Sequence, residues 1–156
     1  HSLIKSKMLE ENALLAGEMS GHIFFNHHWY GFDDGIYAAA RLLAILSEQS
    51  CTTDEFFEKF PNSINTPELK LAVDETEKFS FIQKLITHAK FANAHMNLLD
   101  GIRVEFENGW GLIRASNTSP YLTFRFEANT HATLLKIQSL FREQLLALNP
   151  LLNLPF

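Results

Sequence analysis

Apolar and polar residues alternate along several stretches of the second part of the chain. Such alternation is typical of half-buried strands, whose successive side chains point to opposite faces. An Asn108-Gly109 pair, a strong hairpin signal, separates two of these stretches. The sequence predicts strands over 69–73, 102–106, 110–113 and 121–127, and helices over 77–92 and 130–148. This order, β-α-β-β-β-α, predicts an antiparallel four-stranded sheet with two helices on one face.

In the first part of the chain, short apolar runs precede longer helical stretches. The pattern predicts an amphipathic helix containing Leu3, Ile4, Met8 and Leu9, strands at 13–16 and 23–25, a helix over 36–46 and a short helix ending at Phe60. Asp33 or Asp34 can cap the first of the two later helices, and Thr53 or Asp54 the second. A strand followed by a helix, repeated, favours a parallel sheet, but so few strands could not close a core of their own.

Residues 62–67 are rich in turn formers and predict a linker between two domains. We therefore expect an α+β chain overall, with a partial α/β (βα) segment over residues 1–61 and the antiparallel domain over residues 62–156. The chain starts at His1 rather than at methionine, inside a polar–apolar pattern. We expect it to be a fragment or a processed form of a longer protein.

Composition narrows the possible classes of protein. With 156 residues, of which 46% are hydrophobic, the chain can bury one sizeable core or two small ones. A net charge of −5 argues against a nucleic-acid-binding protein that neutralises phosphates. The single cysteine, Cys51, excludes an internal disulfide and fits the reducing cytoplasm. No apolar run approaches the roughly 18 residues of a membrane-spanning helix, so we expect no membrane partner.

Several metal-binding residue types lie close together in the first part, namely His22, His27, His28 and the pair Asp33-Asp34. Their spacing does not complete a tetrahedral zinc set. For the two aspartates, capping a helix N-terminus is favoured over binding a divalent ion. We expect no metal site in this chain.

A polar segment between the last two predicted strands has the composition of a phosphate-binding loop. Residues 114–120 are Arg-Ala-Ser-Asn-Thr-Ser-Pro. A guanidinium can donate to two phosphate oxygens, while hydroxyls, an amide and backbone N–H groups add neutral donors. The same residue types also form ordinary polar turns. Arg114 could also pair with Glu105 or Glu127 on the neighbouring strands.

A second polar segment, residues 17–22, combines a carboxylate with a hydroxyl. Glu18 is an acceptor beside the Ser20 hydroxyl, and the flanking Gly17 and Gly21 let the backbone approach a ligand closely. A carboxylate in this setting can accept hydrogen bonds from neighbouring sugar hydroxyls. The alternative is a helix or turn cap without a ligand.

Together, these two polar segments resemble the α-D-phosphohexomutases, specifically their phosphomannomutase/phosphoglucomutase branch. Gly-Phe-Asp-Asp-Gly-Ile-Tyr at 31–37 and Asp-Gly-Ile-Arg-Val-Glu-Phe at 100–106, followed by Gly-Trp-Gly at 109–111, are also similar to this family. The motifs follow the family's order over nearly the whole chain. The resemblance implies that residues 1–61 are the C-terminal part of the family's α/β domain 3, and that residues 62–156 are its C-terminal domain 4.

The resemblance also implies roles for individual residues. Glu18 and Ser20 would bind hydroxyls of the hexose ring, with His22 and His1 in support. Met19 favours the mannose/glucose branch, since phosphoglucosamine mutases usually carry Gln at the matching position. The phosphate that is not transferred would be held by the later loop, through Arg114, Ser116, Asn117, Thr118 and Ser119.

The family's reaction moves a phosphoryl group between an active-site serine and the C1 or C6 hydroxyl of a sugar. It passes through a hexose 1,6-bisphosphate and uses Mg²⁺. Neither the Ser-His-Asn-Pro-type loop of that serine nor the Asp-Gly-Asp-Gly-Asp-type metal loop occurs in this sequence. The resemblance therefore implies a phosphosugar substrate, no activity of this chain alone, and dependence on N-terminal domains of the same protein.

Two alternatives remain at this point. The chain could come from a phosphoglucosamine mutase, which turnover of mannose, glucose and glucosamine phosphates would reveal. It could also be a stand-alone, non-enzymatic binding module, because a sheet covered by helices on one face is a plausible platform for a partner. Strongly salt-dependent binding to oligonucleotides would favour that module.

Overall fold

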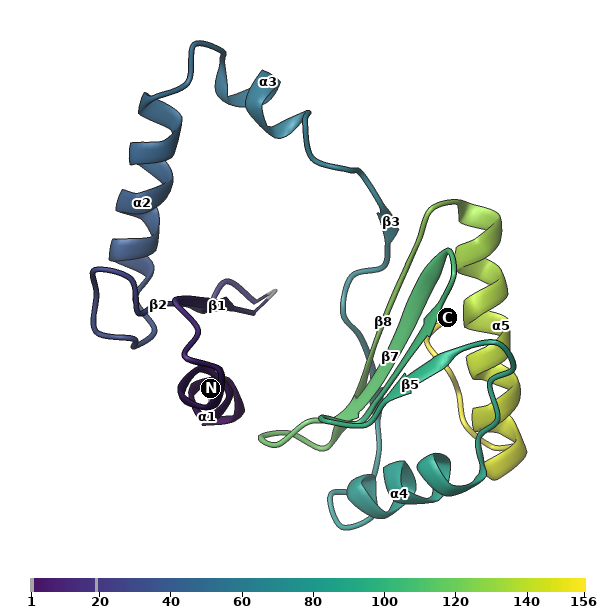
Figure 1. Ribbon diagram of the computed structural model, residues 1–156. Coiled ribbons are helices and arrows are strands. Elements are labelled where there is room, and N and C mark those ends of the chain that lie inside the picture. Colours follow the sequence, from purple (N-terminus) through teal and green to yellow (C-terminus); the bar gives the residue numbers. More distant parts are fainter. Residues whose placement is uncertain (1, 19) are drawn as a thin grey trace. The chain divides into compact units, whose positions relative to one another are not determined.

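The computed structural model describes residues 2–18 and 20–156. The chain divides into two compact units, residues 1–61 and 62–156. In Figure 1 the first unit runs from purple to teal, and the second from teal to yellow.

The first unit contains a two-stranded hairpin and helices. Its elements are α1 (Ser2–Glu11), β1 (Leu15–Gly17), β2 (Ile23–Phe25), α2 (Gly35–Ser47) and α3 (Thr53–Phe57). Strands β1 and β2 pair antiparallel, with Ala16 opposite Phe24. The predicted parallel arrangement is therefore wrong for these two strands. Residues 18–22 alone connect them, whereas parallel neighbours need a crossover of about a dozen residues or more.

Side-chain caps begin two helices of this unit. The Asp34 carboxylate accepts from the Tyr37 N–H at 2.9 Å, which confirms the predicted cap of α2. Helix α3 is capped by Thr52, one residue before the predicted positions, and ends at Phe57 rather than Phe60. The Thr52 hydroxyl accepts from the Glu55 N–H, while the Glu55 carboxylate accepts from the Thr52 N–H at 2.8 Å. This reciprocal capping box fixes where α3 begins.

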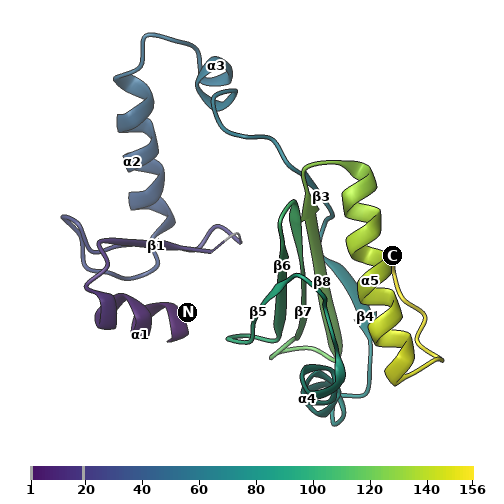
Figure 2. The ribbon, with the colours of Figure 1, turned by 45° about the vertical axis from the view of Figure 1, so that its right-hand side comes forward.

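The second unit is an antiparallel sheet with α4 (Lys78–His88) and α5 (His131–Leu148) packed against it (Figures 1 and 2). In the described part of the chain the sheet has six strands: β3 (Ile64–Asn65), β4 (Leu69–Ala72), β5 (His95–Asn97), β6 (Ile102–Phe106), β7 (Gly109–Ala115) and β8 (Tyr121–Ala128). Their order is β3-β8-β7-β6-β5, and β4 also pairs with β8. The predicted sheet and its two helices are confirmed.

The strands that the sequence pattern misses are the shortest ones. β3 lies inside the predicted linker and pairs with β8, with Ile64 opposite Ala128. β5 pairs with β6, with Met96 opposite Val104. Two or three residues are too few for alternation to be recognised, because the strand signal needs about four to eight residues.

One core joins the sheet to both helices. Val104 of β6, Ile113 of β7 and Phe124 of β8 are fully buried. They pack in one cluster with Leu85 of α4 and Phe141 of α5, and Figure 2 shows α5 along one side of the sheet. Because strand side chains alternate, the arginines of β6, β7 and β8 lie on the opposite face. None of the described helices is long and apolar enough to cross a lipid bilayer.

The packing of α5 on β7 predicts the effect of one methyl group. A Cβ added at Gly111 would lie 2.5 Å from Cε2 of Phe141 and 3.0 Å from Cδ1 of Phe126. Both rings are buried, so Gly111→Ala should destabilise the second unit by about 1–3 kcal/mol through overpacking. Urea unfolding followed by NMR signals of β6–β8 measures this change.

The matched control is Gly35→Ala, because a Cβ at Gly35 would meet no atom within 4 Å. This control should leave the unfolding midpoint of the second unit in place. Equal midpoints for Gly111→Ala and the unmodified chain would contradict the described packing of Phe141.

Candidate functional site

The polar segment 114–120 is the connection between β7 and β8. The register of the two strands places Arg114 opposite Thr123 and Ala115 opposite Leu122. The pairing continues for one more step, because the Ser116 N–H donates to the Tyr121 carbonyl at 2.9 Å. The chain therefore turns within residues 117–120. The turn presents its polar groups at one end of the sheet.

Arg114 pairs with an acid that sequence reasoning missed. Its Nη1 lies 3.1 Å from Oδ2 of Asp100, and both side chains are about half exposed, at 45% and 49%. Glu105, one of the two acids considered as partners of Arg114, instead accepts from Arg103 Nε at 2.8 Å. An exposed pair of this kind contributes little stability. It does restrict the directions in which the guanidinium can point.

The strand register explains how Asp100 comes to lie beside Arg114. Ile102 of β6 is opposite Ile113 of β7, so one step further along places Gly101 against Arg114. Gly101 has φ of +81°, and a Cβ there would lie 2.3 Å from the Ile113 carbonyl oxygen and 2.8 Å from the Arg114 Cα. Only glycine fits both the conformation and the space. This close approach brings the Asp100 side chain within reach of the guanidinium.

The turn itself keeps donors available. The Thr118 N–H donates to the Ser116 hydroxyl oxygen at 3.3 Å, and the Tyr121 N–H donates to the Ser119 carbonyl at 2.8 Å. Within the described residues, the N–H groups of Asn117 and Ser119 make no hydrogen bond. Asn117 and Thr118 are exposed, while Ser116 and Ser119 are half-buried. The five predicted phosphate-binding residues are thus brought together at one turn.

The polar segment 17–22 forms the turn between β1 and β2. The Gly21 N–H donates to the Glu18 carbonyl at 3.0 Å, and the Glu18 N–H donates to the His22 carbonyl at 2.8 Å. The Ser20 hydroxyl donates to the Glu18 carboxylate at 3.1 Å. Glu18, Ser20 and His22 are therefore neighbours on one hairpin turn. His1 and Met19, the other two predicted residues of this region, lie outside the described residues.

His22 has a close acidic partner, Asp33, for which the sequence favoured helix capping over binding a divalent ion. Its Nδ1 lies 2.6 Å from Oδ2 of Asp33, and the two side chains are 42% and 28% exposed. Asp33 is brought there by an isolated antiparallel bridge to Phe24 of β2. The next residue, Asp34, caps α2 and also accepts from the Trp29 indole N–H at 3.0 Å. The two aspartates thus have different tasks.

The chain is similar to known proteins over most of its length. Residues 1–63 match the family model described as phosphoglucomutase/phosphomannomutase, alpha/beta/alpha domain III. Residues 68–144 match the model of the phosphoglucomutase/phosphomannomutase C-terminal domain. The chain belongs to the phosphoglucomutase/phosphomannomutase family.

Relatives of this phosphohexomutase chain are considerably longer than it is. A phosphomannomutase/phosphoglucomutase of Pseudomonas syringae pv. tomato is 53% identical over all 156 residues, which are 34% of its length. A phosphoglucomutase of Neisseria gonorrhoeae is 50% identical over 144 residues, or 91% of this chain and 31% of the relative. A crystal structure of a family protein from Burkholderia thailandensis has a TM-score of 0.90 at 48% identity, over the whole chain and 33% of that protein. The chain thus spans about one third of the relatives that it matches.

The described part of this phosphohexomutase chain gathers no group of three or more His, Cys, Asp or Glu side chains that could hold a metal ion. The pair of His22 and Asp33 brings together two such side chains. These residues do not form the carboxylate-rich set that magnesium prefers.

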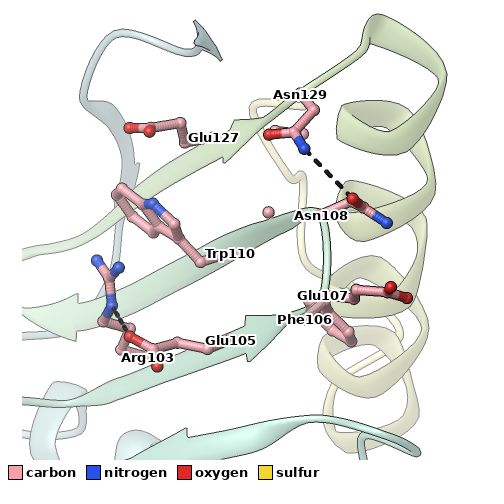
Figure 3. A pocket seen from close by; sticks show the side chains of 10 residues that line it. Arg103, Glu105, Phe106, Glu107, Asn108, Trp110, Glu127 and Asn129 are labelled. Atoms are coloured by element: carbon pink, nitrogen blue, oxygen red, sulfur yellow. Dashed lines mark hydrogen bonds and ion pairs between the residues drawn. The ribbon is translucent and has the colours of Figure 1, made fainter. Parts of the chain in front are cut away.

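A hollow of about 280 Å³ lies at the other end of the same strands, around the β6–β7 hairpin (Figure 3). Figure 3 shows Arg103 bonded to Glu105, and Asn108 bonded to Asn129. The Arg103 guanidinium also stacks 3.9 Å from the Trp110 ring centroid. From this end to Ala115, β7 extends roughly 20 Å. The hollow is therefore distinct from the Arg114 turn, and its one arginine is already engaged.

The bond from Arg103 lowers the pKa of Glu105 below its ordinary value of 4.5, with the charge of Arg103 adding to the effect. A lowered pKa in the folded protein means that the carboxylate form favours folding. The resulting contribution to the free energy of unfolding is fully present above pH 4.5. It is lost as the pH falls through the lower pKa of Glu105 in the folded protein.

An NMR titration of the Glu105 side-chain carbonyl carbon tests this assignment. The unmodified chain should show a midpoint below 4.5, and Arg103→Met should move it upward, toward the ordinary value. The matched control is Arg142→Met, which removes the same charge from α5 and should leave the Glu105 midpoint in place. An unchanged midpoint in Arg103→Met would refute the assigned cause.

Proposed function

We propose that this chain is the substrate-recognition part of a phosphomannomutase/phosphoglucomutase. The complete enzyme would interconvert hexose 1-phosphate and hexose 6-phosphate through a phosphoserine and a hexose 1,6-bisphosphate. The observation that carries this proposal is the turn after Arg114. There an exposed guanidinium, paired with Asp100, adjoins the hydroxyls of the turn and the backbone N–H groups of Asn117 and Ser119, which make no hydrogen bond within the described residues.

The turn would act as a clamp on the phosphate that is not transferred. A guanidinium has five N–H donors, and Asp100 engages one terminal nitrogen of Arg114. The remaining donors can bond to phosphate oxygens, and such charge-assisted bonds are roughly twice as strong as neutral ones. Ser116, Asn117, Thr118 and Ser119 would supply the neutral donors.

A clamp of this kind suits a reaction in which the sugar binds in two orientations. Phosphate is attached at C1 in one orientation and at C6 in the other. Donors directed at the outer phosphate oxygens do not depend on the carbon to which the phosphate is bound. The same turn could therefore hold either phosphosugar.

The hairpin turn of the first unit would recognise the sugar. The Glu18 carboxylate and the Ser20 hydroxyl already lie 3.1 Å apart, so one pair of neighbouring sugar hydroxyls could bond to both. The His22 ring would support them, held by Asp33, whose Oδ2 lies 2.6 Å from the His22 Nδ1. His1 completes the proposed set. Mannose and glucose phosphates are the substrates that we propose, with cytoplasmic localisation for the complete enzyme.

The phosphoryl transfer itself would need groups from other parts of the complete enzyme. We propose that the nucleophilic serine and the Mg²⁺ ligands lie in the two thirds of the relatives' length that this chain does not cover. In that arrangement the metal would neutralise charge on the transferring group. This chain alone is expected to be inactive, with no catalytic residue of its own.

Replacing Arg114 tests the clamp. In the 156-residue chain, inorganic phosphate should shift the backbone NMR signals of residues 114–119, and Arg114→Ala should abolish these shifts. In the complete enzyme the same substitution should raise KM for a hexose phosphate by about 10- to 100-fold, as the loss of charge-assisted bonds requires.

The matched control is Arg103→Ala, which removes the same charge from the neighbouring strand but leaves the turn intact. It should keep both the phosphate-induced shifts and KM near those of the unmodified protein. Unchanged KM and unchanged shifts in Arg114→Ala would refute the clamp.

Replacing Glu18 tests sugar recognition separately. Glu18→Gln keeps the size of the side chain but removes its charge, so it should weaken acceptance from sugar hydroxyls. In the complete enzyme we expect KM for mannose 1-phosphate to rise about tenfold or more. Binding of inorganic phosphate to residues 114–119 should stay the same.

Glu10→Gln is the control for Glu18, since Glu10 pairs only with exposed Lys7 at the surface of α1 in the described structure. It should leave both measurements unchanged. If Glu18→Gln weakened phosphate and sugar phosphate equally, the separate sugar-binding role would be wrong.

A further inference from the structure

A lysine with no exposed side-chain surface contacts the Arg114 turn. Lys78 is the first residue of α4, and its side chain is 0% exposed. Its Nζ donates to the Ser119 carbonyl oxygen at 3.0 Å. The same Nζ lies 2.6 Å from Oε1 of Glu75. Lysines are almost never fully buried unless they are paired, so both contacts are needed to hold this ammonium group.

Other hydrogen bonds fasten the same part of the turn. The Ser119 carbonyl also accepts from the Tyr121 N–H at 2.8 Å, and the Pro120 carbonyl accepts from the Val73 N–H at 3.0 Å. Lys78 itself is held where α4 begins, because its N–H donates to the Asp74 carbonyl at 3.1 Å. The connection between β4 and α4, together with Lys78, therefore holds the C-terminal residues of the turn, Ser119 and Pro120. In the described structure, the exposed tip, Asn117 and Thr118, makes no hydrogen bond to this connection.

The direction of the Ser119 carbonyl matters for an anion site. A carbonyl oxygen carries partial negative charge, so it would repel phosphate if it pointed toward the bound oxygens. Lys78 gives this oxygen a positively charged partner on the α4 side. The following residue is Pro120, whose fixed φ and missing N–H further limit the turn. The Ser119 carbonyl oxygen is thereby engaged on the α4 side.

We propose that Lys78 is a positioning residue for the phosphate clamp. It holds the Ser119 carbonyl away from the ligand and so fixes the turn in its binding conformation before phosphate arrives. The ammonium does not itself bond to phosphate, because the side chain has no exposed surface and two of its three N–H donors go to Ser119 and Glu75. This inference rests on the proposed function of the turn and adds the residue that preorganises it.

The first experiment compares Lys78→Met with the unmodified 156-residue chain. Methionine is unbranched and of similar length, so it preserves most of the packing and removes the donor. We expect amide hydrogen exchange of Ser116 and Tyr121 to accelerate by about tenfold or more, and the Kd for inorganic phosphate to rise by a similar factor. Exchange of amides in the centre of β6 and β7 should not change, which separates a local effect from general unfolding.

Lys84→Met is the matched control, because Lys84 is an exposed lysine on the same helix. It removes the same charge and should leave both the exchange rates of the turn and the phosphate Kd in place. Equal phosphate affinity in Lys78→Met and in the unmodified chain would overturn the proposal.

A second measurement needs no substitution and decides the question even if Lys78→Met fails to fold. Reductive methylation of the unmodified chain, followed by mass spectrometry, reports how often each lysine amine becomes accessible. Lys78 should react far more slowly than Lys84, and saturating phosphate should slow Lys78 further while leaving Lys84 unchanged. Phosphate should slow the methylation of Lys78 because a ligand that binds only the ordered turn makes opening of the turn less frequent.

The two proposals can fail separately in these experiments. If phosphate shifts no signal of residues 114–119 in the unmodified chain, the clamp itself is refuted. If phosphate binds there but leaves the methylation rate of Lys78 unchanged, Lys78 is a structural lysine only and the positioning role is refuted.

Discussion

The register of β6, β7 and β8 is the constraint on which the second unit depends. Pairing Ile102 with Ile113, and Ile113 with Phe124, directs every second side chain of three strands toward α4 and α5. A shift of one residue would exchange the core face for the exposed face. The same pairing sets Gly101 directly against Arg114, where no Cβ could fit. The core and the position of the guanidinium therefore follow from one alignment of strands.

Much of this unit could be predicted because its signals are local. Alternation in β6 and β8 and the helical spacing of α5 can be recognised within each element. The Asn108-Gly109 signal also finds the hairpin, although Gly109 itself lies in β7, opposite Phe106. The first unit was harder, because the antiparallel pairing of β1 and β2 follows from the five-residue connection rather than from apolar runs. Helix α4 ends at His88, short of the predicted residue 92, since Ala89 is extended at ψ of 137°. The apolar pattern continues past that point because Phe91 still packs against the core.

The candidate site residues can be recognised in the sequence more easily than the residues that they contact. The composition of the Arg114 turn is visible in seven consecutive residues. A two-residue Asn108-Gly109 loop would place residue 103 opposite residue 114. In the structure Gly109 pairs with Phe106 instead, which places residue 101 there, so the hairpin signal alone does not find Asp100. The pairing of His22 with Asp33 spans eleven residues and needs the bridge from Asp33 to Phe24. The burial of Lys78 arises only when α4 packs beside the turn, so no sequence pattern indicates it.

The two units differ in how far they form a core, and this difference bears on how the two turns would work. Among the described hydrophobic residues of the first unit, only Met8 and Phe24 are buried, while Ile36 and Leu43 of α2 are 87% and 66% exposed. A two-stranded hairpin is marginal by itself in water. We expect the turn at residues 17–22, proposed to bind the sugar, to gain its rigidity from further layers of the α/β/α domain.

The turn after Arg114, proposed to bind phosphate, has a different kind of support. It is fastened to a sheet whose central residues, such as Ile113 and Phe124, are fully buried, and to a lysine that has no exposed side-chain surface. A donor array held by such contacts loses little conformational entropy when it binds an anion. Phosphate recognition can therefore be preorganised within the second unit alone. Recognition of the sugar would instead depend on assembly of the complete enzyme, so binding of phosphate could precede the ordering of the sugar-binding turn.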